Sequence, residues 1–348
     1  MALVVVAAGG WFGYRELTGT GCSGEVRLTV AVAPEIATAV RDTAADWVRA
    51  GGSVAGTCVA VDVVEADAVD VAAVVAGQHG VSLAGVGQAS GTTLVPDVWV
   101  PDSSLWLQRL SSVASGFQPT NRASIAQSPV VLAMPEPVAA TLGWPNHEPT
   151  WSTLLQQVAT GTRLRTGLVE PGRDAAGLSG LMALARAAGT AGGDAQRATM
   201  SALRALATGR SLLRQDLLAK FPRSTDPAVI ASSLGAAPLS EEDVIEYNAR
   251  RPPVALAALY LRPAPMALDY PYAVLPGLPP DRAAAAGQLF QRLTAEQFRA
   301  RLAARGLRAP DGSWDAGFQA PAGARPATEV PASGAAGGGP DPTAPERA

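Results

Sequence analysis

Two continuous apolar stretches constrain the fold of this chain more than any other feature. Residues 127–135 (QSPVVLAMP) and 253–260 (PVALAALY) are each long enough for one buried strand, and prolines bound them. A long segment with helix and strand patterns of its own lies between them. This arrangement predicts a lobe inserted into another lobe, with the two stretches as the hinge and a ligand cleft between the lobes. The alternative is that both stretches are ordinary core strands of one α/β domain.

The residues before the first stretch alternate between strand and helix patterns. We expect strands over residues 25–32, 58–64 and 95–100. Helices are expected to begin at Pro34, near Asp70, and after Asp102, which we expect to be an N-cap. Strands and helices that alternate in this way predict an open, largely parallel sheet.

The remaining chain contains further helix patterns and ends in a segment of low complexity. Between the apolar stretches we expect a short strand over 164–169 and helices over 150–158, 178–188, 194–208, 211–218, 227–234 and 240–250. A strand over 269–275 and amphipathic helices over 281–293 and 294–305 follow the second stretch. Residues 319–348 are rich in proline, glycine and alanine, which predicts a linker.

The amino-terminal residues and the two cysteines indicate an exported protein. Residues 1–14 (MALVVVAAGGWFGY) are apolar but shorter than the about 20 residues of a full span. They fit the apolar region of a signal peptide or of a truncated signal-anchor, although a basic amino-terminal region is missing; a buried helix is the alternative. Cys22 and Cys58 would close a loop whose disulfide contributes about 4 kcal/mol. Lipidation of Cys22 is the rival reading, but the preceding Gly-Thr-Gly is a poor lipidation signal.

Charge and motifs exclude several classes of function. The net charge is −3, with 27 basic and 30 acidic residues, so no strong field favours nucleic acid. The chain has no phosphate-binding GxxxxGK[ST] motif and no CxxC pair for zinc. His79 and His147 lie in polar loops, and the segment 177–181 (GLSGL) departs from the nucleophile elbow and fits a helix face of small residues. We therefore expect no catalytic residue, no metal and no cofactor.

Five segments together resemble an extracellular solute-binding protein of the type II periplasmic-binding fold, nearest to the molybdate-like group. They are residues 96–106 (PDVWVPDSSLW), 128–135 (SPVVLAMP), 170–178 (EPGRDAAGL), 269–275 (DYPYAVL) and 306–312 (GLRAPDG). The chain is similar in particular to the binding module that precedes a von Willebrand factor A domain in some proteins. The resemblance implies a two-lobed α/β fold, each lobe a mostly parallel sheet flanked by helices, joined by two crossing strands. The lobes would be residues 22–127 with 254–318, and residues 128–253, after a signal or anchor segment over 1–21.

The resemblance also implies where a ligand would bind. Ligands of such proteins lie on loops and helix N-termini, where unpaired N–H groups favour anions. The residues placed there are Ala33, Pro34, Asp102, Ser103, Ser104, Ser128, Arg173, Asp174 and Tyr270. Ala33 and Asp174 stand where oxyanion binders usually offer hydroxyls, and a carboxylate repels an anion unless Arg173 screens it. We therefore do not expect molybdate or sulfate, and Asp174 has a second reading as a helix N-cap.

These observations predict a non-catalytic binding module outside the cytoplasm, anchored to the membrane by its amino-terminal segment or secreted. It would capture a small molecule or ion for uptake or sensing, with a membrane permease of the ABC-transporter type as the expected partner. The alternative is a degenerate binding fold that serves as a scaffold beside a von Willebrand factor A domain and binds an envelope protein.

Overall fold

The fold is described from a computed structural model, which describes residues 21–89, 91, 93–146, 150–151, 154, 164–189 and 195–326. Two compact units divide the chain. Unit 1 holds residues up to Ile125, then Tyr270–Arg305 and 315–317, and unit 2 holds Ala126–Asp269, Gly306–Trp314 and the residues from Phe318 onward. Residues 126–127, 254–269, 306–314 and 318 therefore group with unit 2, although the resemblance placed them in the first lobe. The expected segment 1–21 falls almost entirely outside the described residues, as does the linker beyond residue 326.

Unit 1 is built on a five-stranded sheet in the order β2-β3-β1-β4-β8. Its strands are β1 (Glu25–Val32), β2 (Ser53–Val54), β3 (Thr57–Glu65), β4 (Val98–Val100) and β8 (Ala273–Val274). Strand β1 pairs in parallel with β3 and with β4, whereas β2 and β8 pair antiparallel at the two edges. The largely parallel sheet predicted for this part of the chain is thus confirmed.

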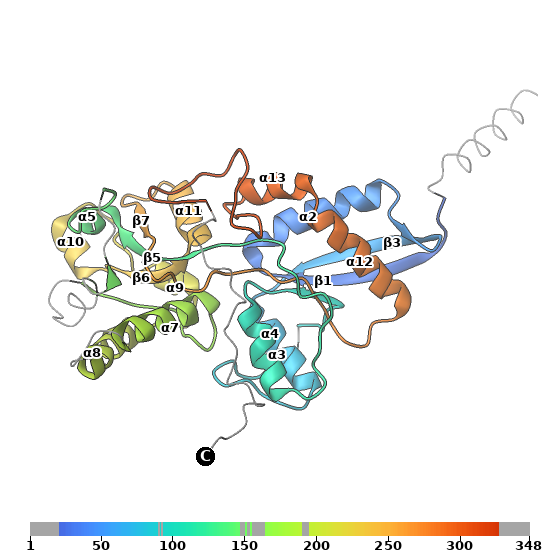
Figure 1. The fold of residues 1–348 in the computed structure, drawn as a ribbon, viewed down its shortest axis with the longest axis horizontal. Coiled ribbons are helices and arrows are strands. Elements are labelled where there is room, and N and C mark those ends of the chain that lie inside the picture. The colour runs from blue at the N-terminus through green and yellow to red at the C-terminus, as the bar shows by residue number, and fades with distance from the viewer. Residues whose placement is uncertain are drawn as a thin grey trace, which may run out of the picture. The chain divides into compact units, whose positions relative to one another are not determined.

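Helices flank this sheet in unit 1 (Figure 1). They are α2 (Pro34–Arg49), α3 (Ala68–Gln78), α4 (Ser104–Val113), α12 (Pro280–Leu293) and α13 (Glu296–Ala304). Helix α2 begins with a proline, which suits the first turn because its missing N–H would have no partner there. It buries Ile36, Val40 and Trp47 on one face, and Gly51, with a φ of 83°, follows its C-cap. Helices α12 and α13 pack against α2, although more than two hundred residues separate them in sequence.

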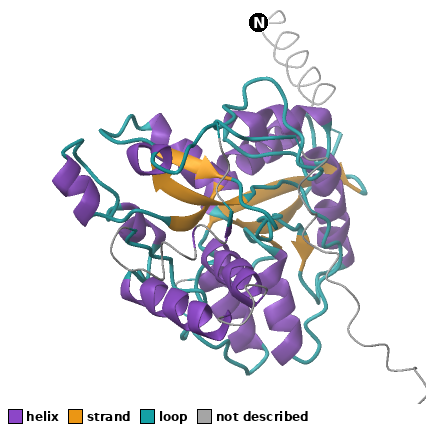
Figure 2. Ribbon diagram, turned by 60° about the vertical axis from the view of Figure 1, so that its left-hand side comes forward, coloured by secondary structure: helices purple, strands orange, loops and turns teal. Residues whose placement is uncertain are grey.

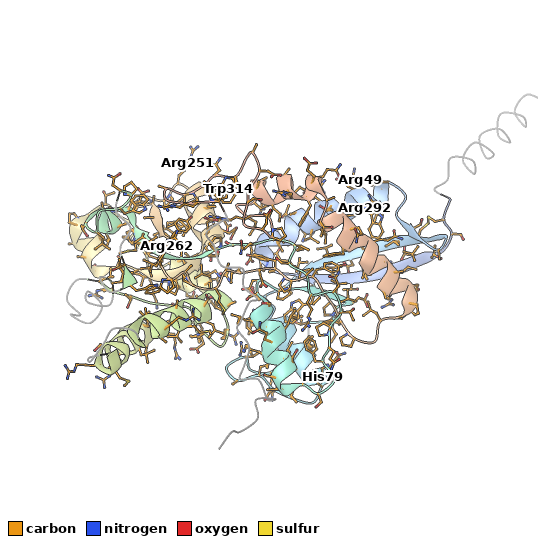
Figure 3. All side chains as sticks on the ribbon, viewed as in Figure 1. Arg49, His79, Arg251, Arg262, Arg292 and Trp314 are labelled. Carbon is orange, nitrogen blue, oxygen red and sulfur yellow. A yellow bond between two sulfur atoms is a disulfide. The ribbon has the colours of Figure 1, made fainter. Side chains whose placement is uncertain are left out.

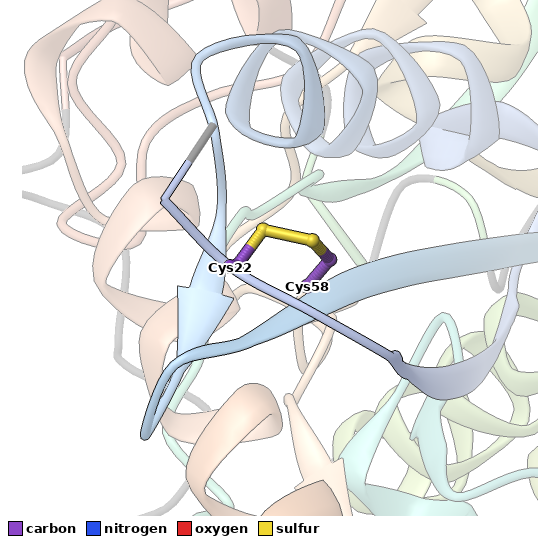
Figure 4. Close-up of a disulfide and its surroundings, with 2 residues drawn as sticks. All are labelled: Cys22 and Cys58. Atoms are coloured by element: carbon purple, nitrogen blue, oxygen red, sulfur yellow. A yellow bond between two sulfur atoms is a disulfide. The ribbon is translucent and has the colours of Figure 1, made fainter. Parts of the chain in front are cut away.

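A disulfide joins Cys22 to Cys58, as predicted (Figure 4). The pairing of β1 with β3 explains the proximity, because Cys58 lies opposite Glu25 in the register and Cys22 precedes β1. The two Cα atoms are 5.0 Å apart, within the range that a disulfide spans. The bond therefore closes the end of the sheet at which β1 and β3 begin.

Unit 2 contains a three-stranded sheet in the order β6-β5-β7, with β5 (Val130–Pro135), β6 (Ala237–Ser240) and β7 (Leu256–Leu259). Strand β5 pairs antiparallel with both neighbours, so the prediction of a mostly parallel sheet is wrong for these strands. Among the described residues of unit 2, parallel pairing occurs only at two isolated bridges, Thr166 with Ala236 and Val169 with Ser211. These bridges replace the continuous strand expected over 164–169.

The apolar stretches 127–135 and 253–260 contain β5 and β7, which lie side by side in unit 2. Within β5 and β7, every side chain except that of Leu132 is buried, since helices cover the sheet. This burial explains the apolar sequence of the two strands. The chain passes from one unit to the other before β5 and after β7, at residues 125–126 and 269–270, and again between residues 305 and 318. Both stretches thus lie inside unit 2, and a hinge between lobes stays a prediction.

The helices of unit 2 are close to their expected positions except for α5, which the sequence did not predict. Figure 2 colours all described helices purple and all described strands orange. They are α5 (Glu136–Ala140), α7 (Ala175–Gly189), α8 (Ala195–Thr208), α9 (Arg214–Leu218), α10 (Pro227–Ser232) and α11 (Glu241–Ala249). The helix predicted over 150–158 falls mainly outside the described residues. Small residues let α7 approach the sheet, because a Cβ on Gly180 would lie 2.3 Å from the Cβ of Pro238. The predicted helix face of small residues is therefore confirmed.

Candidate functional site

Two helix N-termini meet at one edge of the unit 1 sheet. Because β1 and β4 are parallel neighbours, their carboxyl ends lie at the same edge, and each is followed by a helix, α2 or α4. Ala33, the N-cap of α2, donates its backbone N–H to the carbonyl of Val100 over 2.9 Å, which ties the two strand ends together. Its side chain caps nothing, and Pro34 is exposed at the first helical position. We call this place the carboxyl edge of unit 1; it lies at the ends of the central strands β1 and β4 and not along an outer strand.

Tyr270 lies beneath this edge and has no exposed surface. Its backbone has a φ of 39°, in the left-handed region that only a few non-glycine residues adopt, and its N–H donates to the carbonyl of Asp102 over 3.2 Å. Its hydroxyl donates to Oε1 of Glu35 over 3.0 Å. Tyr270, which the resemblance placed among the ligand-binding residues, is therefore held by Glu35, a buried carboxylate in the first turn of α2 that the sequence analysis did not single out.

Asp102 and the two serines after it have separate roles. The carboxylate of Asp102 accepts a 2.7 Å hydrogen bond from the indole of Trp106, one turn further on. The N-cap of α4 is Ser103, whose hydroxyl accepts from the N–H of Leu105 over 3.2 Å, so the expectation that Asp102 caps this helix is wrong by one residue. Ser104 opens the helix and is half-buried.

The guanidinium of Arg109 lies over the ring of Trp106. The guanidinium carbon of Arg109 lies 4.9 Å from the centre of the Trp106 ring, and the guanidinium donates to the carbonyl of Ala84 over 2.8 Å. Burial lowers the pKa of Arg109 from its ordinary value. Trp106 is therefore fixed between a carboxylate and a cation, which holds the first turn of α4 in one position.

In unit 2, Asp174 is the N-cap of α7. Its Oδ1 accepts from the N–H of Gly177 over 2.7 Å, which confirms the second reading of this residue. Its Oδ2 accepts from Arg214 over 2.9 Å, and Arg214 also reaches Oδ1 of Asp243 over 3.4 Å. Arg214, forty residues away, thus neutralises Asp174. Arg173 is half-buried in the loop before the helix.

Ser128 belongs to the support of another helix. It is fully buried, and its hydroxyl accepts from the N–H of Glu242 in the first turn of α11 over 3.1 Å. Ser240 and Asp243 form a capping box at the start of the same helix. Asp243 therefore joins the α11 cap to Arg214 and, through it, to Asp174 at the start of α7.

The residues predicted to bind a ligand differ in their exposure. Of the nine residues predicted to bind a ligand, only Pro34, Ser104 and Arg173 have appreciable exposed surface. His79 packs edge-on against Phe117 with ring centres 5.8 Å apart, and His147 lies outside the described residues. No group of three or more histidine, cysteine or carboxylate side chains suitable for a metal occurs among the described residues. Within those same ranges, every helix is too short or too polar to cross a membrane.

Comparison with known families gave one match over most of the chain. A family described as "Bacterial extracellular solute-binding protein" matches residues 28–308. A search of curated proteins found no match to the sequence.

Solved structures share the fold at low sequence identity. A periplasmic thiamin binding protein has a TM-score of 0.55 and 12% identity, over 85% of this chain and 87% of its own. The GacH receptor of Streptomyces glaucescens GLA.O, solved unliganded and with acarbose, has a TM-score of 0.53 and 10% identity, over 83% and 80%. A cyclic alpha-maltosyl-1,6-maltose binding protein from Arthrobacter globiformis has a TM-score of 0.51 and 12% identity, over 85% and 82%. The fold is that of the type II periplasmic binding proteins.

Proposed function

Because this chain belongs to the bacterial extracellular solute-binding protein family, we propose that it captures a small polar solute and delivers it to a membrane permease. The observation that carries this proposal is the carboxyl edge of unit 1, where the N-termini of α2 and α4 lie side by side. Solutes of open α/β sheets bind outside the carboxyl ends of the strands. The interlobe location expected from the sequence stays a prediction, and the proposal places the solute only at this edge.

Two carboxylates at the edge determine which solutes fit. Glu35, in the first turn of α2, and Asp102, one residue before the N-cap of α4, are both buried, at 8% and 5% exposure. Each places negative charge where the positive helix ends would otherwise attract an anion. A carboxylate a few ångströms from a bound anion costs on the order of 1 kcal/mol or more even in partly solvated surroundings. The solute is therefore a neutral or cationic polar molecule, such as a sugar or an amine, rather than an oxyanion.

Ser104 is the side chain best placed to contact such a solute. It is the first residue of α4 and keeps exposed surface, whereas Ser103 and Asp102 beside it are buried. A hydroxyl both donates and accepts, so it suits a sugar hydroxyl or an ammonium group. Ser104 also lies among the N–H groups of the first turn, which have no partner within the helix.

A thermal-shift screen with matched serine variants tests the proposal. The library contains sugars, amino acids, polyamines and oxyanions, and a neutral or cationic compound is expected to raise the melting temperature through linkage. The shift is expected to shrink in Ser104→Ala and to persist in Ser112→Ala, which removes an exposed hydroxyl from the same helix. A shift with oxyanions alone, or one equally reduced in both variants, contradicts the proposal.

The setting of this function is also part of the proposal. The matching family is extracellular, and the Cys22–Cys58 disulfide fits an oxidising compartment. We propose that residues 1–21 direct export or attach the chain to the membrane, and that an ABC-transporter permease receives the solute. Loss of membrane association when residues 1–21 are replaced by a cleavable signal peptide would support attachment. Unchanged fractionation with the membrane would contradict it.

A scaffold function is the second candidate, and one observation favours it. Asp174 is already engaged by the α7 amide and by Arg214, and Ala33 offers no side-chain donor, so two positions that often contact ligands in this fold are occupied by structural roles. In that case the module would bind an envelope protein beside a von Willebrand factor A domain. A flat thermal-shift screen together with capture of an envelope protein would favour this candidate.

A further inference from the structure

A cavity lies within unit 1 at the carboxyl end of α2, whereas the carboxyl edge lies at the amino end of the same helix. It has a volume of about 440 Å³, which is in the range of small-molecule sites. Its walls come from the last turn of α2, the loop 50–53 after it, the end of α12 and the start of α13. The carboxyl edge instead lies at the start of α2, so no residue is shared with the site proposed above.

Arginines outnumber carboxylates around this cavity. Arg301 donates to the hydroxyl of Thr43 over 2.6 Å and forms an ion pair with Asp46, which also pairs with Arg49. The hydrogen bond from Arg301 lowers the pKa of Asp46 below its ordinary value, so this carboxylate is ionised and already shared by two cations. Arg292 also lines the cavity and is exposed, and its guanidinium forms no hydrogen bond or ion pair with the described residues. Figure 3 labels Arg49 and Arg292 near α2 and α12.

Helix ends add further partial charges to the wall. Ala295 is the N-cap of α13 and provides no side-chain acceptor, so the N–H groups of Glu296 and Gln297 have no acceptor among the described residues. The carboxylate of Glu296 belongs to this first turn but does not line the cavity. Helices α2 and α12 present their negative ends here, and Arg49 and Arg292 lie in those last turns and offset them. The excess charge of the cavity is therefore positive.

The floor of the cavity is apolar. It is made by Trp47 and Phe298, which are 4% and 1% exposed. The indole N–H of Trp47 has no acceptor among the described residues. Gly52 lies against the indole, where a Cβ would come within 2.9 Å of Cε2 and Nε1. A residue without a side chain is thus required beside the indole, and the wall offers polar donors above an apolar surface.

We propose that this cavity binds a small organic anion, whose carboxylate or phosphate contacts Arg292 and the first turn of α13 while its apolar body lies on Trp47 and Phe298. Guanidinium groups recognise such oxygens through short, charge-assisted hydrogen bonds. Arg301 is already held by Thr43 and Asp46, so it adds charge with a fixed position, whereas Arg292 supplies the free donors. This site is separate from the carboxyl edge. It would bind an anion, whereas the carboxyl edge would bind a neutral or cationic solute.

Phenyl phosphate is a suitable probe, because it joins an anion to a flat apolar ring. In a titration followed by ¹H–¹⁵N NMR of the full chain, phenyl phosphate is expected to shift the Trp47 indole N–H signal with saturation. Inorganic phosphate and phenol, which each carry half of the probe, are expected to bind more weakly than phenyl phosphate. Arg292→Gln is expected to weaken phenyl phosphate binding by about tenfold or more.

Arg122→Gln is the matched control, since Arg122 is an exposed arginine of the same unit that does not line the cavity. It is expected to leave the affinity for phenyl phosphate unchanged. An unshifted Trp47 signal, or equal losses in the two variants, overturns the proposal. Equal affinities for phenyl phosphate and inorganic phosphate would also overturn it, because the apolar floor would then contribute nothing. Arg292→Gln should leave any solute-induced thermal shift intact, which separates this site from the function proposed above.

Discussion

Replacing Arg308 with methionine should remove the cation from an ion pair that is sealed from water. The side chains of Arg308 and Glu241 are both fully buried in unit 2. The guanidinium donates to Oε2 of Glu241 over 2.6 Å, to its Oε1, and to the carbonyl of Arg325 over 2.6 Å. The hydroxyl of Tyr260 donates to the same carboxylate, so Glu241 would keep one neutral donor after the substitution.

The expected loss of stability follows from the burial of this pair. Breaking a buried ion pair at one end costs about 3–5 kcal/mol, because the remaining charge is left in a low-dielectric interior. The guanidinium carbon of Arg308 also lies 4.6 Å from the ring centre of Trp314, and this cation–π contact is lost too. We expect Arg308→Met to lower the free energy of unfolding by about 4 kcal/mol, a large share of the about 5–15 kcal/mol typical of native proteins.

Urea unfolding followed by circular dichroism measures this loss, with an exposed pair as control. Arg250 and Glu246 form an ion pair one turn apart on α11, with 69% and 54% of their side chains exposed, and Arg250→Met should cost less than about 1 kcal/mol. The double variant Arg308→Met with Glu241→Gln should lose less than the sum of the two single variants, because no unpaired charge remains. A loss in Arg308→Met no larger than in Arg250→Met would refute this reasoning.

Three further predictions concern the disulfide, two tyrosines and one helix cap. Replacing Cys22 and Cys58 with serine should lower the free energy of unfolding by about 4 kcal/mol, because the disulfide closes a loop between residues 36 apart. A reductant should produce the same loss in the unmodified protein. An unchanged urea midpoint would contradict this prediction. Burial raises the pKa of Tyr260 and of Tyr272 well above 10. Both tyrosines therefore stay protonated in the folded state at pH values at which tyrosines of the unfolded chain ionise. The stability that they contribute is complete below pH 10 and should fall above it by about 1.4 kcal/mol per pH unit for each tyrosine; phenolate absorbance showing all tyrosines ionised in the native protein at pH 11 would disprove this. Asp174→Ala should cost about 1–2 kcal/mol in urea unfolding and Asp174→Asn less, because asparagine still caps; equal losses would count against the capping role.

The backbone of unit 1 was predictable because its signals are local. Alternating apolar residues marked β1, Pro34 marked the first turn of α2, and the two glycines after it marked the end. The cysteine pairing was predictable for the same reason, since the sequence has only two cysteines, one just before β1 and one at the start of the neighbouring β3. The N-cap of α4 was missed by one residue because Asp102 and Ser103 have similar capping preferences, and only the geometry of Trp106 separates them.

Unit 2 and the site contacts depended on long-range packing that no local pattern records. The apolar sequences of β5 and β7 indicate burial but not direction, so their antiparallel pairing was not predictable. Arg214 and Asp174 are forty residues apart, and Glu35 and Tyr270 are more than two hundred apart. The composition of the expected linker from residue 319 also did not indicate that its first residues contact unit 2, where the carbonyl of Arg325 accepts a hydrogen bond from Arg308.

Hydrogen exchange with and without a solute that raises the melting temperature tests the location of binding most directly. If the solute lies at the carboxyl edge of unit 1, peptides covering the first turns of α2 and α4, residues 33–37 and 102–106, should exchange more slowly when it is bound. Peptides over α12 and α13 should exchange at unchanged rates. Protection confined to other segments, with both first turns unaffected, would contradict solute capture at this edge.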